Sequence, residues 1–162
     1  MHKRACAFLF TLLIPGVALA HGTEDHSKQT TIVEHVHGAA LGQPGDPKAP
    51  ARTVALTMTD QMRFNPAKIM VRPGETIRFV VKNAGTIKHE MVLGTMDELK
   101  EHAALMLKFP EMEHEDPNAV SVEPGKTGTL VWKFTTKPGE FDFGCLVPGH
   151  FEGGMVGKIV AR

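Results

Sequence analysis

The chain has 162 residues, with 18 Lys and Arg, 18 Asp and Glu, and a formal net charge of zero. This balance lacks the basic excess that is typical of nucleic-acid-binding domains, so we expect no nucleic-acid partner. The length suffices for one domain with its own core.

The first 20 residues have the organisation of a secretory signal peptide. Lys3 and Arg4 precede an apolar run, and residues 18–20, Ala-Leu-Ala, form a small-residue cleavage motif. The run is interrupted by Pro-Gly at 15–16 and is shorter than the roughly 20 residues that span a bilayer. We therefore predict cleavage before His21, export to the periplasm and no membrane span afterwards; the alternative is that the apolar run is retained as an anchor.

Cleavage would remove Cys6 and leave Cys145 as the one cysteine of the exported chain. The 142 remaining residues would carry 16 basic and 18 acidic side chains. One cysteine cannot form an internal disulfide, and a lone thiol in an oxidising compartment is protected only by burial or by a metal. Cys145 is therefore the first indication of a metal site.

Residues 21–51 lack a lasting apolar period and are rich in Gly, Pro and charged residues near their end. We predict a largely disordered tail and linker over 21–51, with the folded domain at 52–162. The tail carries four histidines, His21, His26, His35 and His37. They are either part of a solvated tail or a weak additional copper-binding region.

From residue 52 onward, short segments alternate apolar and polar residues and are separated by Pro-Gly turns at 72–75, 123–126 and 137–140. The apolar positions are Val54, Leu56, Met58, Ile69, Val71, Ile77, Phe79, Val81, Leu130, Trp132 and Phe134. This spacing predicts an all-β fold, a β-sandwich.

One segment, residues 95–109, predicts a short inserted helix. Thr95 and Glu98 form a capping box. The apolar residues that follow at helical spacing are Leu99, Ala103, Met106 and Leu107. We expect His102 to face solvent. Met106, Met112 and His114 are either ordinary core and loop residues or a Cu(I)-capturing group.

Three candidate metal ligands lie in one loop: Cys145, His150 and Met155 follow one another at intervals of five residues. With one distant histidine they make the ligand set of a type 1 copper site, which uses two imidazoles, a thiolate and a weak axial thioether. His89 follows a bend and is the preferred second histidine. The alternatives are a coincidence of unrelated side chains and, for Met155, a backbone carbonyl as axial donor.

The Cys-x4-His-x4-Met pattern, with the upstream strand KHEMVLG, resembles the cupredoxin family, which includes plastocyanin, azurin and pseudoazurin. Within that family, the export signal, His-rich tail and inserted helix resemble a subgroup of periplasmic copper-resistance cupredoxins. The resemblance implies a Greek-key β-sandwich over 52–162. It also implies His89, Cys145, His150 and Met155 as the ligands of one copper ion.

Two features depart from the common family pattern. Glu90 stands where many blue-copper proteins have an asparagine that ties the two ligand loops together, so that link is either absent or made differently. The spacing between Cys145 and His150 is longer than in plastocyanin and is similar to that in azurin.

Apolar residues of the loop predict a collar around His150 where a redox partner docks briefly. They are Leu146, Val147, Pro148 and Phe151. We expect a monomer with one-electron redox chemistry. Copper oxidases and nitrite reductases hold a further copper site with His-x-His ligands on additional domains, whereas the His-x-His pair of this chain, at 35 and 37, lies in the predicted tail. We therefore expect no enzymatic activity. The leading hypothesis is a periplasmic copper-tolerance protein, and the alternative is a soluble periplasmic electron carrier.

Overall fold

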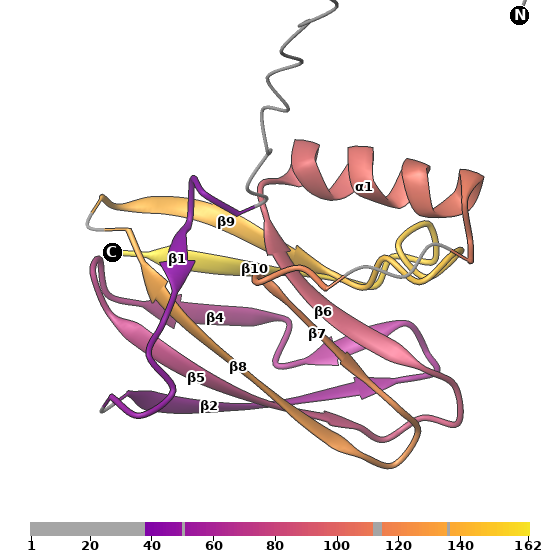
Figure 1. Ribbon diagram of the computed structural model, residues 1–162, viewed down its shortest axis with the longest axis horizontal. Helices are drawn as coiled ribbons and strands as arrows, with labels where there is room; N and C mark the ends of the chain where they lie inside the picture. Colours follow the sequence, from indigo (N-terminus) through magenta and orange to yellow (C-terminus); the bar gives the residue numbers. More distant parts are fainter. Residues whose placement is uncertain (1–37, 50, 112–114, 136) are drawn as a thin grey trace, which may run out of the picture. The chain divides into compact units, whose positions relative to one another are not determined.

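The computed structural model describes residues 38–49, 51–111, 115–135 and 137–162. Its strands form two five-stranded sheets (Figure 1). The first sheet has the order β1-β8-β5-β2-β3. Its strands are β1 (Gly42–Pro44), β2 (Arg52–Thr59), β3 (Arg63–Asn65), β5 (Thr76–Asn83) and β8 (Thr127–Phe134).

The second sheet has the order β4-β10-β9-β6-β7. Its strands are β4 (Lys68–Val71), β6 (His89–Gly94), β7 (Ala119–Val122), β9 (Gly139–Gly144) and β10 (Val156–Ala161). Strand pairs β2–β5 and β4–β10 are parallel, and the other pairs are antiparallel. The predicted all-β sandwich is confirmed.

The core lies between the two sheets because alternate residues of each strand point inward. From the first sheet it receives Leu56, Met58, Ile77, Phe79, Val81, Leu130, Trp132 and Phe134. From the second sheet it receives Ile69, Val71, Met91, Leu93, Phe141, Phe143 and Ile159. The period-two pattern thus predicted the inward face of both sheets.

The inserted helix α1 spans Met96–Lys108 and packs on β6 and β9 (Figure 1). Thr95 and Glu98 form the predicted capping box. The buried face of the helix is Leu99, His102, Ala103 and Met106. The expectation that His102 faces solvent is therefore wrong, and Leu107 is exposed instead of buried.

The predicted boundary at residue 52 is too late, because part of the expected linker is folded. Residues 42–44 form β1, which pairs with β8. Leu41 is fully buried in the core, and its carbonyl accepts a hydrogen bond from the N–H of Thr135. Apolar burial and edge pairing outweigh the Gly- and Pro-rich composition of this segment. The predicted signal peptide, and the tail up to residue 37, lie outside the described residues.

Within the described ranges, no helix combines the length and the apolar character that a bilayer crossing requires.

Candidate metal centre

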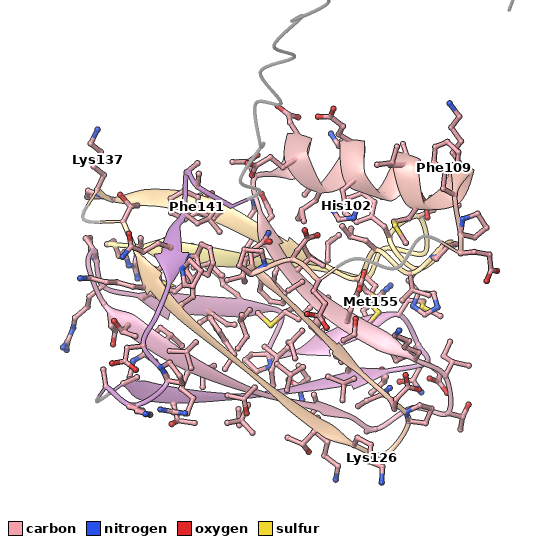
Figure 2. All side chains as sticks on the ribbon, viewed as in Figure 1. His102, Phe109, Lys126, Lys137, Phe141 and Met155 are labelled. Carbon is pink, nitrogen blue, oxygen red and sulfur yellow. The ribbon has the colours of Figure 1, made fainter. Side chains whose placement is uncertain are left out.

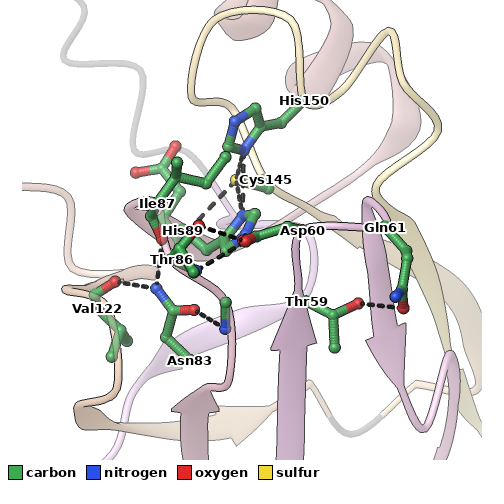
Figure 3. A network of polar contacts seen from close by, with 12 residues as sticks. Thr59, Asp60, Gln61, Asn83, Thr86, Ile87, His89, Val122, Cys145 and His150 are labelled. Atoms are coloured by element: carbon green, nitrogen blue, oxygen red, sulfur yellow. Dashed lines mark hydrogen bonds and ion pairs between the residues drawn. The ribbon is translucent and has the colours of Figure 1, made fainter.

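Three side chains from two separate segments converge at one end of the sandwich (Figure 3). His89 begins β6, Cys145 directly follows β9, and His150 lies in the loop between β9 and β10. The residues are 0%, 0% and 8% exposed. His89, the predicted long-range partner, lies beside the loop that carries Cys145 because β6 pairs with β9.

The facing atoms are the Nδ1 atoms of both histidines and the Sγ atom of Cys145. The two Nδ1 atoms are 3.1 Å apart. Sγ lies 3.2 Å from Nδ1 of His150 and 4.0 Å from Nδ1 of His89. Metal–nitrogen and metal–sulfur bonds of about 2.0 and 2.3 Å allow two donors of one ion to be at most roughly 4 Å apart. The three separations therefore fit donors to a single ion.

The loop that carries Cys145 and His150 is closed on itself by backbone hydrogen bonds. The N–H of Cys145 donates to the carbonyl of Met155, and the N–H of Met155 donates to the carbonyl of His150, both at 3.0 Å. Gly149 and Gly154 have φ angles of +87° and +84°, in the left-handed region that glycine favours. These two glycines therefore allow the turns of the loop.

Met155 is fully buried and joins the core at the base of this loop (Figure 2). Its backbone contacts tie it to both Cys145 and His150, as a short loop between paired strands requires. Its role as the axial donor stays a prediction.

Burial sets the protonation of the cluster. It raises the pKa of the Cys145 thiol to about 12, although the backbone N–H groups of Glu90 and Val147 donate to the sulfur and oppose this shift. Burial also lowers the pKa of His150, and the neighbouring His89 adds to the effect. At neutral pH the pocket therefore offers a neutral imidazole at His150 and a thiol that must lose its proton to bind a metal.

Residues 52–162 match the family of copper-binding proteins described as the plastocyanin/azurin family. The chain belongs to this family. Membership, together with a donor set of one thiolate and two imidazoles that suits copper, identifies copper as the cofactor.

Curated relatives of this plastocyanin/azurin-family chain include proteins named copper-resistant cuproprotein CopI. The one from Rubrivivax gelatinosus is 55% identical over 130 residues, which cover 79% of this chain and 78% of that protein. The one from Pseudomonas aeruginosa is 35% identical over 155 residues, which cover 78% of this chain and 84% of that protein.

Solved structures with the same fold include dithionite-reduced auracyanin from Roseiflexus castenholzii. Its TM-score is 0.59 at 21% identity, and the match covers 70% of this chain and 99% of that one. An azurin from Methylomonas sp. strain J has a TM-score of 0.55 at 15% identity, over 70% of this chain and 99% of its own. At these identities the likeness supports the cupredoxin fold alone.

In this cupredoxin, Glu90 links the segment that carries His89 to the segment that carries Cys145. Its Oε1 accepts a hydrogen bond of 3.0 Å from the N–H of Leu146, and its Oε2 accepts one of 3.2 Å from Ser121. Its own N–H donates to Sγ of Cys145 at 3.4 Å. The question raised by the missing asparagine is thereby answered: a carboxylate makes the link.

Asn83 organises the bend before His89. The residue is fully buried, and its Nδ2 donates to the carbonyls of Ile87 and Val122 at 2.7 and 2.9 Å. Its Oδ1 accepts from the N–H of Gly85 at 2.8 Å. These three bonds fix the bend without a regular element and so place His89 at the start of β6.

Asp60 is a site residue that the sequence reasoning missed. It follows β2, and its Oδ1 lies 3.0 Å from Nε2 of His89 (Figure 3). Hydrogen bonds from the backbone and side chain of Thr86, followed by the one from His89, lower the pKa of Asp60 to about 2. No local pattern marks Asp60, because its partners are 26 and 29 residues away.

Of the remaining candidates, His102 lies in the described part of the chain and does not join the cluster of His89, Cys145 and His150. His102 lies on the buried face of α1, with its Nδ1 3.8 Å from Oδ2 of Asp116 (Figure 2). Met106, on the same face, belongs to a cluster of buried residues with Val92, Leu99, Ala103 and Leu146. Met112, His114 and the four tail histidines lie outside the described residues.

The four residues of the predicted collar around His150 differ in their exposure to solvent. Leu146 is 1% exposed and packs under α1 with Leu99, so it is core. Val147 and Phe151 are partly buried against core clusters, and Pro148 is exposed.

Proposed function

We propose that this protein is an exported periplasmic cupredoxin that binds one copper ion through His89, Cys145, His150 and Met155 and contributes to copper tolerance. The observation that carries the proposal is the convergence of Nδ1, Sγ and Nδ1 from two segments in a buried pocket. Support for the tolerance role comes from the relatives named copper-resistant cuproprotein, which align over most of the chain.

Bound copper would supply one-electron redox chemistry between Cu(II) and Cu(I). The thiolate and the thioether favour Cu(I), whereas imidazole suits both states. The buried positions of Cys145 and His89 exclude water, and the closed loop between β9 and β10 limits movement of the donors. The proposal includes no catalytic step beyond electron transfer.

Export is supported by Lys3 and Arg4 ahead of an apolar run and by the Ala-Leu-Ala motif at 18–20. Docking of a redox partner is proposed near His150, where Pro148 is exposed and Val147 is partly exposed. We propose that the protein works as a monomer.

The test is growth of a gene-deletion strain on graded copper, complemented with the wild-type gene or with Cys145→Ser. We expect copper sensitivity that the wild type rescues and the serine variant does not. Unchanged copper tolerance with a respiratory defect would contradict the tolerance role and favour the electron-carrier alternative.

A further inference from the structure

We propose that Asp60 is a positioning residue of the copper site: its carboxylate selects the tautomer and the orientation of His89 before the metal arrives. This inference rests on the proposed function of the site. It assigns a role in copper binding to a residue outside the ligand set.

The first step concerns the proton on His89. Oδ1 of Asp60 lies 3.0 Å from Nε2 of His89. An ionised carboxylate only accepts hydrogen bonds, so Nε2 carries the proton. A neutral imidazole then has its lone pair on Nδ1, the atom that faces Nδ1 of His150 and Sγ of Cys145. The contact therefore points a metal-binding lone pair at the other donors.

The second step concerns what holds Asp60 itself. Its other oxygen, Oδ2, accepts from the N–H of Thr86 at 2.7 Å and from its hydroxyl at 2.8 Å. A Cβ atom at residue 85 would overlap Oδ1 of Asp60, and Gly85 leaves that space open. One oxygen is thus anchored by the bend before His89, while the other is left for the ring.

The third step is the consequence of losing the carboxylate. A neutral His89 without this acceptor can carry its proton on Nδ1, which would direct an N–H into the pocket in place of a lone pair. Partners that orient a ligating histidine typically contribute 10- to 100-fold to metal affinity. The fully buried ring has its Nε2 edge toward a side chain that is 37% exposed, so the partner is accessible to substitution without opening the core.

The experiment compares Asp60→Ala with Asp60→Asn, Thr86→Val and Glu140→Gln. In Asp60→Asn the amide oxygen has to face the N–H of Thr86, so the amide nitrogen faces Nε2 of His89 and can only donate to it. Thr86→Val loosens the anchor of Oδ2 but leaves Oδ1 beside His89, and so reports on a merely structural role. Glu140→Gln removes one exposed negative charge at the opposite end of β9. Each variant is first checked for its fold by circular dichroism.

Two quantities are measured. The tautomer of His89 is read from ¹⁵N shifts of the metal-free protein in weakly alkaline buffer, and Cu(II) affinity is read by competition with a chelator. We expect wild type and both controls to keep the proton on Nε2, whereas Asp60→Asn should move it to Nδ1 because its amide nitrogen donates to Nε2. Asp60→Ala is expected to show mixed tautomers and a roughly 10- to 100-fold lower affinity.

A second substitution disturbs the contact between Asp60 and His89 without changing Asp60. Gly85→Ala places a methyl group against Oδ1 and should reproduce the tautomer change of Asp60→Ala. Unchanged tautomer and affinity in a folded Asp60→Ala variant would overturn the inference, as would an equal loss in Thr86→Val. A wild-type protein that binds no copper would instead overturn the proposed function. The two failures can be told apart because the tautomer of His89 is measured in the metal-free protein.

Discussion

Oε1 of Glu90 accepts a hydrogen bond of 3.0 Å from the N–H of Leu146, so the residue after one site histidine holds the residue after the site cysteine. This contact joins the start of β6 to the loop that follows β9. It fixes the relative position of His89 and Cys145, two proposed ligands that are far apart in the chain.

We therefore expect Glu90→Ala to destabilise the protein by about 1–3 kcal/mol, because the N–H of Leu146 loses its acceptor in a partly buried place. Glu90→Gln keeps an acceptor oxygen and should cost less. Urea unfolding of the copper-free variants measures the difference. Equal stability of the alanine variant and the wild type would show that the hydrogen bond between Leu146 and Glu90 does not stabilise the fold.

The helix is predicted to stabilise the metal-binding loop. Leu99 is 1% exposed and packs with Leu146. Leu99→Ala should lower the free energy of unfolding by about 2–5 kcal/mol, since it leaves a cavity beside the loop.

A matched control is available on the same helix. Leu107 is 50% exposed, so Leu107→Ala should change stability by no more than about 0.5 kcal/mol. Similar losses in both variants, measured by the same urea titration, would contradict the packing of α1 on the loop.

Copper binding is predicted to release a proton from Cys145. Burial raises the pKa of the thiol to about 12, so at neutral pH the metal-free protein holds this proton and the bound thiolate does not. Apparent copper affinity should therefore rise with pH, by about tenfold per unit for one released proton, and fall on acidification.

The measurement is calorimetric titration with Cu(II) at pH 7–8 in two buffers of different ionisation enthalpy, with Cys145→Ser as control. His150 adds little, because its pKa is lowered and its ring is already neutral. A binding heat that is independent of the buffer would show that no proton is released.

Met155→Leu tests the proposed axial donor. Copper should stay bound, and the reduction potential should rise because a weak donor to Cu(II) is lost. A tenfold loss of affinity for Cu(II) relative to Cu(I) raises the reduction potential by about 59 mV. Voltammetry of the loaded variant measures the shift, and a lower potential would mean that Met155 does not serve as the axial donor.

The sequence predicted the parts of the site that local pattern controls. Cys145 and His150 share one loop with Met155, and the short spacing leaves few ways to place them; the ligand role of Met155 stays a prediction. His89 was found because a bend precedes it and a strand follows. The strand faces were found because inward residues alternate along each strand.

The parts that failed depend on contacts between distant segments. Asp60 reaches His89 only through the packing of the turn after β2 against the bend at 84–88. His102 is polar yet buried, because it lies on the face that α1 turns toward β6 and β9. Leu41 joins the core although its neighbours have the composition of a linker.

The visible absorption and EPR spectra of the copper-loaded protein show whether Cys145 binds the copper, with Cys145→Ser measured beside the wild type. We predict an intense thiolate-to-copper band in the wild type, its loss in the serine variant, and an unchanged fold of both copper-free proteins. A loaded wild type without the band, or a serine variant that keeps it, would contradict the assignment of Cys145 as the copper ligand.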